Sequence, residues 1–384
     1  MKQVDSQFNM SNCDIIIVGA GLAGLTSAIH LSKYRVNVLL IEKNRLPKHK
    51  VCGEYISNEV LPYLEFLGID PFKFGAKRIN QFELSTSQNK TIKSQLPLGG
   101  FGISRFKIDK VLADKAEENG VKIIYDSVSD IEYENNEFTV STLNKSKYKS
   151  KFVIGAYGKR SGIDFKLNRK FIKKKSPYLA VKTHVKGNFP SDLVALHNFE
   201  GGYCGASKVE DGSINLCYIT DFNSFKKYNS IEAFQENVVY KNRNLESLFE
   251  YSEKVFESPL TISQISFLPK NPVEHHVIMC GDTAGLIHPL CGNGMSMAIR
   301  SAQIASTLIL KYFQSSSITR EGLEEAYKKA WNKAFRLRLQ TGQLIAQILR
   351  SKRLTAFFFI ILSWFPFLIP EIIKLTHGKP IRVR

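Results

Sequence analysis

Acidic residues are scarce relative to basic ones in this chain of 384 residues. It has 35 aspartates and glutamates against 53 lysines and arginines, which gives a formal net charge of +18 at pH 7. Such an excess indicates attraction to an anionic partner. The basic residues are scattered, and no zinc-finger, helix-turn-helix or RNP-type pattern accompanies them. We therefore expect an anionic membrane surface as partner and no nucleic acid.

Cysteines are also few. The six cysteines form no C-x-x-C pair, so we expect reduced thiols in a cytoplasmic protein and no disulfides. No cluster of Cys, His, Asp or Glu has the spacing of metal ligands, and we predict no metal.

One uncharged run stands out, from Leu354 to Pro370. It falls short of the roughly 20 apolar residues that span a membrane, and Pro366 and Pro370 interrupt it. Because it is rich in aromatic residues and flanked by basic ones, it is typical of a segment peripheral to the inner membrane face, or of a lid over a hydrophobic pocket. A helix packed on the protein's own surface and a true span are the alternatives.

A glycine-rich turn follows an apolar, β-branched run near the N-terminus. The run predicts a buried parallel strand, and Gly19, Gly21 and Gly24 follow it in the spacing G-x-G-x-x-G. Gly19 permits the tight turn, Gly21 lets the backbone approach a pyrophosphate, and Gly24 lets the next helix pack close to the strand. The pattern predicts a dinucleotide site, with a glycine-rich turn of some other α/β protein as the alternative.

The segments after this turn strengthen the interpretation. Leu22 and Ala23 begin a predicted helix whose N-terminus would hold the phosphates. A second buried strand, residues 36–41, ends on Glu42, a carboxylate placed to accept hydrogen bonds from an adenosine ribose. We count Lys43, which follows it, among the cofactor-binding residues.

A second glycine-containing segment begins directly after the predicted strand 277–280. Asp282 after Gly281 is suited to hold a polyol chain, and the helix start that follows would direct backbone N–H groups at an anion. A reduced flavin needs both. The backbone expected to face it belongs to Gly292, Asn293, Gly294 and Met295.

Together these motifs resemble the FAD-binding fold of p-hydroxybenzoate hydroxylase and its relatives. The resemblance spans about residues 13–310 and rests on G-x-G-x-x-G with Glu42 and on Gly281-Asp282 with Pro289 and Gly292-x-Gly294. Within that group, Lys50-x-Cys52-Gly53-Glu54 and Arg105-x-x-x-Asp109 resemble the geranylgeranyl reductase family. FAD is the cofactor that the resemblance implies.

Three segments depart from the patterns of these families. The middle motif is Tyr157-Gly158 in place of Asp-Gly, which disfavours a hydroxylase that uses NADPH in the usual way. Tyr203 and Cys204, which we expect to contact substrate, stand where the reductases carry Tyr-x-Trp-x-Phe-Pro, and this disfavours a long prenyl substrate. The Trp-x-Trp-x-Ile-Pro stretch of flavin halogenases is absent.

Three residues are candidates for chemistry or charge pairing. Cys52 resembles the cysteine that lies near flavin and substrate in the reductases and would assist protonation or pack against substrate; a structural buried cysteine is the alternative. His288 is a candidate acid or base, or a packing residue. Arg105 is placed to pair with FAD phosphates or ribityl oxygens.

The order of predicted elements indicates the α/β class. We predict a Rossmann-like FAD-binding domain with an inserted antiparallel β-sheet substrate domain and a C-terminal helical segment. The FAD-binding domain would comprise residues 1–165 and 266–312, the substrate domain residues 166–265 with 78–96 added to its sheet, and the helical cap residues 313–384.

From these motifs and the resemblance we predict a FAD-dependent oxidoreductase that reduces a carbon–carbon double bond of a hydrophobic, isoprenoid-like or polyketide-like substrate. A flavin-dependent monooxygenase of an aromatic or polyketide-like compound is one alternative, and a non-catalytic lipid-binding protein is another. Because there is no second G-x-G-x-x-G, NAD(P)H would bind transiently, or an electron-carrier protein would reduce the flavin.

Overall fold

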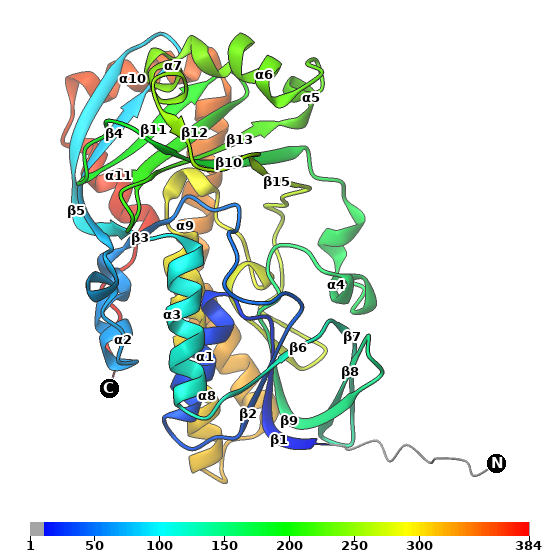
Figure 1. The fold of residues 1–384 in the computed structure, drawn as a ribbon. Coiled ribbons are helices and arrows are strands. Elements are labelled where there is room, and N and C mark those ends of the chain that lie inside the picture. The colour runs from blue at the N-terminus through cyan, green and yellow to red at the C-terminus, as the bar shows by residue number, and fades with distance from the viewer. Residues whose placement is uncertain (1–10, 384) are drawn as a thin grey trace.

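The computed structural model describes residues 11–383, and these residues form two β-sheets joined by helices (Figure 1). The predicted α/β fold class, with an inserted sheet and a C-terminal helical segment, is confirmed. The domain boundaries themselves remain predictions.

The first sheet carries the glycine-rich turn at the end of its central strand. Its strand order is β16-β17-β9-β1-β2-β6, and β7 and β8 extend it through β9. Because the central strands are buried on both faces, they are continuous apolar runs, and Ile15, Ile16 and Ile17 of β1 are fully buried. The strands are β1 (Ser11–Val18), β2 (Val38–Glu42), β6 (Lys122–Tyr125), β7 (Val128–Glu134), β8 (Glu137–Thr142), β9 (Lys147–Gly155), β16 (Val273–Glu274) and β17 (Val277–Met279).

Helices α1 (Leu22–Ser32), α3 (Arg105–Glu118) and α8 (Gly294–Gln314) pack side by side against this sheet (Figure 1). Two short helices, α2 (Leu61–Phe66) and α4 (Gly162–Lys166), lie in its connections.

The second sheet has the order β14-β10-β13-β12-β11-β4-β5-β3, with β15 paired to β10. The prediction of an antiparallel sheet is wrong at one place, because β4 and β11 pair in parallel: β4 enters from a distant part of the chain and needs no hairpin to β11. The strands are β3 (Tyr55–Ser57), β4 (Lys77–Ser85), β5 (Thr91–Gly102), β10 (Tyr178–Lys186), β11 (Leu193–Phe199), β12 (Gly202–Lys208), β13 (Ile214–Asp221), β14 (Glu253–Lys254) and β15 (Leu260–Ser263).

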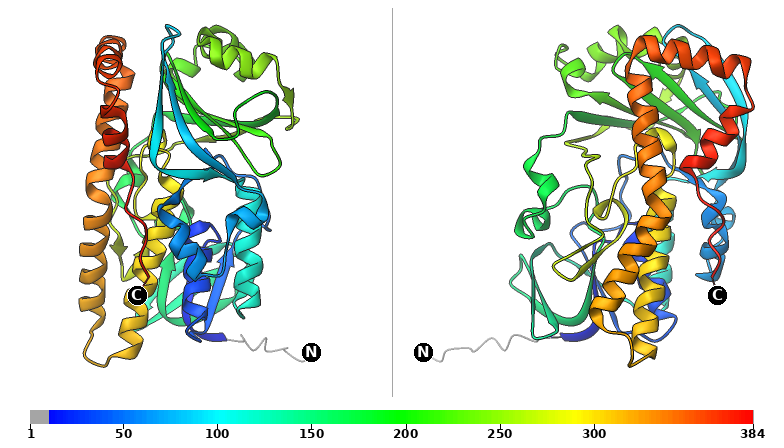
Figure 2. Two further views of the ribbon diagram at one scale, coloured as in Figure 1. Left: turned by 90° about the vertical axis from the view of Figure 1, so that its left-hand side faces the viewer. Right: turned by 180° about the vertical axis from the view of Figure 1, so that it is seen from behind.

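Helices cover both faces of the second sheet (Figure 2). Helices α6 (Ile231–Asn237) and α7 (Arg243–Glu250) pack on one face, where they form a separate apolar core with the sheet, and α5 (Phe222–Phe225) lies beside them. The other face is turned toward the long helix α9 (Arg320–Arg350) and the C-terminal helices α10 (Lys352–Trp364) and α11 (Leu368–Thr376).

The chain after α11 returns to the first part of the protein. The N–H of Ile381 donates to the carbonyl of Glu59 at 2.8 Å, and Arg338 of α9 pairs with the buried Glu59 carboxylate at 3.2 Å. Within residues 11–383 no single helix is long and apolar enough to cross a membrane. Only the pair Arg353–Trp364 and Leu368–Thr376 has the composition, and it is bent by 119°.

Candidate active site

Two of the three glycines in the turn after β1 admit no side chain. A Cβ on Gly24 would lie 1.9 Å from the carbonyl oxygen of Gly19, so only glycine lets α1 begin this close to the strand. Gly19 has φ of 105°, in the left-handed region. At Gly21 a Cβ would meet nothing nearer than the guanidinium of Arg105, 3.8 Å away, so the backbone here is not crowded.

Helix α1 begins at Leu22 and Ala23 without a side-chain cap at Gly21. Its first N–H groups are therefore available to an anion, as the sequence predicted for the phosphates. Glu42 lies beside them, and its carboxylate accepts the N–H of Ala20 at 2.7 Å and that of Asn44 at 3.0 Å. A carboxylate has about four acceptor positions, so Glu42 retains capacity for a ribose hydroxyl. Lys43 is exposed next to it.

The predicted second half of the site lies directly against the first. A Cβ on Gly281 would be 3.2 Å from Cβ of Ala23 in α1 and 3.4 Å from Cβ of Ala298 in α8. The carboxylate of the neighbouring Asp282 makes no hydrogen bond or ion pair to any described residue. Its backbone carbonyl accepts from Nζ of Lys270 at 2.7 Å. The turn is thus held through its backbone, and the acid is free for a ligand.

Helix α8 also starts without a side-chain cap. Pro289 opens a short 3-10 turn, Gly292 follows with φ of 60°, and Gly294 is the first helical residue. The side chain of Asn293 turns away from the helix start and donates to the carbonyl of Thr376 in α11 at 2.7 Å. The backbone from Gly294 to the buried Met295 is what remains to face a ligand.

Arg105 brings positive charge to the glycine-rich turn. Its guanidinium donates to both carboxylate oxygens of Asp109, at 2.9 and 2.8 Å, and Lys50 pairs with the same carboxylate at 2.7 Å. Burial alone would lower the pKa of Arg105, but the fully buried Asp109 outweighs it and the pKa is raised. The guanidinium is therefore a permanent cation beside Gly21.

A buried ionic cluster anchors the loop that carries Cys52. Glu54 has φ of 54° and is fully buried, and its carboxylate contacts Nζ of Lys182 and lies 2.7 Å from Nε2 of His184. Burial raises the pKa of Glu54, but the hydrogen bond from His184 and the charge of Lys182 outweigh it, so the net shift is downward. The sequence motif contained Glu54, but not its partners on β10.

The strand register decides which predicted substrate residues face the cofactor side. Gly205 pairs with Cys217, and Cys217 with Lys182, so these three side-chain positions share one face of the second sheet. Tyr203 lies on this face, packed with the first core, and its hydroxyl has no partner among the described residues. Cys204 points to the opposite face and is buried in the core under α6 and α7. Of the predicted pair, only Tyr203 is placed at the site.

His288 is packed among aromatic rings. Its ring centroid is 4.6 Å from that of Phe267, 5.8 Å from that of Tyr203 and 6.3 Å from that of Tyr178. Burial, aided by the charge of Arg350, lowers the pKa of His288 to about 4. The imidazole is therefore neutral near pH 7 and forms part of a wall, while its predicted acid–base role remains a prediction.

An apolar cavity of about 100 Å³ opens next to Gly292. It lies between the second sheet and the C-terminal helices, and its lining includes Tyr55, which a Cβ on Gly292 would approach to 3.1 Å. The sequence suggested a lid but not the residues beneath it. The wall includes Leu84, Leu196, Leu290, Ile345, Leu349, Phe358, Leu362 and Ile373.

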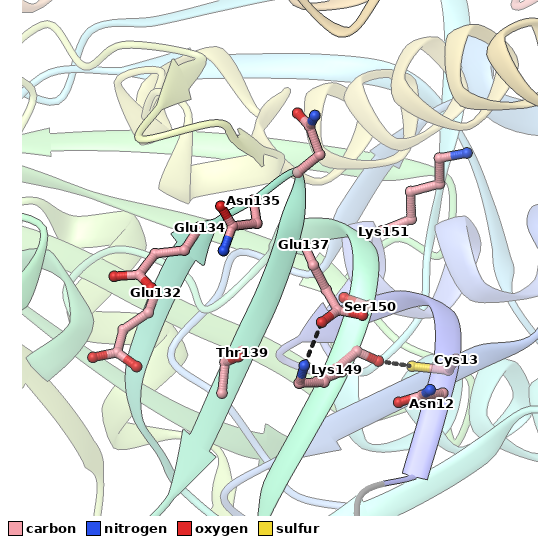
Figure 3. Close-up of a pocket in the computed structure, with 11 residues that line it drawn as sticks. Asn12, Cys13, Glu132, Glu134, Asn135, Glu137, Thr139, Lys149, Ser150 and Lys151 are labelled. Carbon is pink, nitrogen blue, oxygen red and sulfur yellow. Dashed lines mark hydrogen bonds and ion pairs between the residues drawn. The ribbon is translucent and has the colours of Figure 1, made fainter.

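A second, polar cavity of about 680 Å³ lies at the far end of the first sheet, and no predicted site residue lines it (Figure 3). Glu137 pairs there with Lys149 at 2.5 Å. Burial, aided by the charge of Asp14, raises the pKa of the neighbouring Cys13 to about 12, so its thiol is protonated and unreactive. Among the described residues there is no group of three potential metal ligands, here or elsewhere.

The sequence profile of the FAD binding domain family matches residues 12–317. The chain belongs to this family. FAD is its cofactor, and it is a FAD-dependent oxidoreductase.

Proteins similar to this flavoenzyme in sequence or in fold include reductases and a brominase. Digeranylgeranylglycerophospholipid reductase 1 of Methanosphaera stadtmanae is 24% identical over 354 residues, which cover 85% of this chain and 82% of that protein. A geranylgeranyl bacteriochlorophyll reductase-like protein from Thermoplasma acidophilum has a TM-score of 0.70 at 19% identity, covering 89% and 88% of the two chains. The flavin-dependent brominase Bmp2 reaches 0.75 at 17%, covering 95% and 93%. The two solved structures show the shared fold alone.

The residues of this flavoenzyme fit FAD. The uncapped start of α1 and the cation of Arg105 suit the diphosphate, Glu42 suits the adenosine ribose, and the free carboxylate of Asp282 suits the ribityl hydroxyls. The uncapped start of α8 suits the pyrimidine end of the flavin, where negative charge develops on reduction.

Asp282→Ala should weaken FAD binding about tenfold to a hundredfold, because hydrogen bonds to a charged group contribute about 1.5–3 kcal/mol. Titration of the apoprotein with FAD, followed by flavin fluorescence, measures the change. The exposed Asp114→Ala is the control and should bind FAD as the wild type does. An unchanged affinity in Asp282→Ala would refute the placement of the ribityl chain.

His288→Phe should make the protein less sensitive to acid. A histidine with a lowered pKa binds fewer protons when folded, so stability is lost as the pH falls below its ordinary value of 6.5 toward 4. Between pH 7 and pH 5 this residue alone should cost about 2 kcal/mol of unfolding free energy. Urea unfolding at both pH values measures it. The control is His275→Phe, at an exposed position, whose stability should depend on pH as that of the wild type does. If the stability of His288→Phe also kept the wild-type pH dependence, His288 would not be held neutral.

Proposed function

We propose that this flavoenzyme reduces a carbon–carbon double bond of a hydrophobic, isoprenoid-like substrate. The observation that carries the proposal is the apolar cavity that begins at Gly292, the residue directly before the uncapped start of α8. A substrate in this cavity would reach the flavin end of the cofactor site with its reactive carbons.

The walls of the cavity favour hydrocarbon over a polar or aromatic acid. Its side chains are almost all aliphatic or aromatic, and none of the described residues that line it is charged. A cavity of about 150 Å³ with such a lining stays dry and binds benzene, so about 100 Å³ accepts a small apolar fragment at a time. A longer chain would have to extend between the sheet and the helices α10 and α11.

The residues of the chain have a limited set of tasks in this reaction. Bound FAD, once reduced, supplies a hydride. The cavity wall, including Leu196 and Phe358, would orient the double bond and keep water out. Cys52, on the loop held by Glu54, is the candidate that delivers the proton to the second carbon, or solvent does so.

One comparison supports this proposal over a monooxygenase. The relative from Methanosphaera stadtmanae is named as a reductase of a geranylgeranyl phospholipid, and it matches this chain over most of its length. The electron donor we propose is NAD(P)H bound transiently, or an electron-carrier protein.

The test is anaerobic incubation of the dithionite-reduced protein with a phospholipid that carries geranylgeranyl chains, followed by mass spectrometry. We expect a gain of two hydrogen atoms for each double bond reduced. Leu196→Trp, which overfills the cavity, should slow this gain about tenfold or more, whereas the exposed Leu143→Trp should not.

Flavin content should be equal in both variants, which separates loss of the cavity from loss of the cofactor. A lipid that gains one oxygen atom in air, and no hydrogen without it, would favour the monooxygenase. No change in the lipid under either condition would contradict both activities.

A further inference from the structure

Helix α10 is apolar on all its faces, although only one face is covered. Phe359 and Leu362 point inward and are 1% and 2% exposed, whereas Phe357 and Trp364 point outward and are 63% and 77% exposed. A surface helix of a globular protein usually carries polar residues on its outer side. The outer side of α10 is therefore typical of a helix face that an apolar partner, such as lipid or another protein, covers.

The exposed residues form one continuous strip, which we call the C-terminal ridge. Leu354, Phe357, Ile360 and Trp364 follow one another at helical spacing, and Phe365 and Phe367 continue the strip into the turn before α11. Each of the six is at least 46% exposed. Figure 2 shows α10 and α11 on the outside of the molecule, beyond the second sheet.

Two exposed basic residues flank the C-terminal ridge in sequence: Arg353 precedes it and Lys374 of α11 follows it. The one acidic residue in the segment between them, Glu371, forms an ion pair with Lys374 at 2.7 Å. The whole chain carries +18.

We propose that the C-terminal ridge docks this protein on an anionic lipid surface, with the aromatic residues in the interface and the basic residues on lipid phosphates. Apolar and aromatic side chains with a basic border are what such an interface selects. The bend of 119° between α10 and α11 suits a segment that lies in the interface instead of crossing it. A second protein copy would need acidic groups opposite this border, and the ridge itself supplies only the paired Glu371.

Docking would place the cavity at the lipid. The inner sides of α10 and α11 line the cavity at Phe358, Leu362 and Ile373. The outer sides of the same two helices form or adjoin the ridge. A lipid chain could pass between these helices and the sheet without crossing water. This last step rests on the proposed function, whereas docking itself does not.

The two tryptophans provide a direct test. Trp364 lies on the ridge, whereas Trp331 is buried in the interior, 5% exposed. The FAD-loaded full-length protein is mixed with vesicles of phosphatidylcholine and phosphatidylglycerol that carry bromine on the acyl chains. We expect bromine to quench the wild-type tryptophan fluorescence, and not that of Trp364→Phe, in which only Trp331 reports.

Co-sedimentation with unbrominated vesicles tests the ridge as a surface. The triple variant F357S/W364S/F367S should bind about tenfold or more weakly, because it removes three apolar side chains that the lipid would bury. The matched control F165S/F222S/Y251S removes three exposed aromatics elsewhere and should bind as the wild type does. R353Q/K374Q should lower the preference for phosphatidylglycerol.

Undiminished vesicle binding by the ridge variant, at wild-type flavin content, would overturn the proposal. A second outcome would also overturn it: the wild type forms a dimer in sedimentation velocity, the ridge variant does not, and neither binds vesicles. The ridge would then bind a second copy of the chain. Hydrogenation measured in detergent separates the two claims: its absence with intact vesicle binding would refute the proposed function alone.

Discussion

Two helices that begin side by side without caps are the constraint around which the site is built. Gly281 fits between Ala23 at the start of α1 and Ala298 near the start of α8, and neither helix satisfies its first N–H groups with a side chain. Unsatisfied donors of this kind are costly unless a ligand or water accepts from them. The diphosphate and the flavin ring of FAD would meet that need, and Gly21 leaves room for the approach to α1.

The C-terminal helices complete the site that these two helices begin. Asn293 at the start of α8 donates to Thr376 at the end of α11, and Arg338 of α9 pairs with Glu59 beside the second sheet. These contacts hold the turn before α8 and the C-terminal helices that line the apolar cavity together. The family match ends at residue 317, so these helices lie beyond the part of the chain that shows the family.

The cofactor half of the site was predictable because its motifs are local. The glycine spacing, Glu42 and Asp282 each follow a strand within a few residues, so sequence order fixes their place at the strand ends. The substrate half depends on long-range pairing. Tyr203 and Cys204 are neighbours in sequence but face opposite sides of β12, and Glu54 meets Lys182 and His184 from a strand far along the chain. No local sequence signal marks the parallel pairing of β4 with β11, because the two strands are far apart in the chain. The same holds for the cavity wall, whose residues come from several elements.

The central claim is that electrons leave the flavin toward an apolar double bond. Stopped-flow absorbance measures this directly when the reduced protein is mixed, without oxygen, with a geranylgeranyl phospholipid in detergent. We predict that the oxidised flavin spectrum returns in one turnover at a rate that rises with lipid concentration and then saturates. A flavin that stays reduced with lipid, and reoxidises only when oxygen is admitted, would contradict the account.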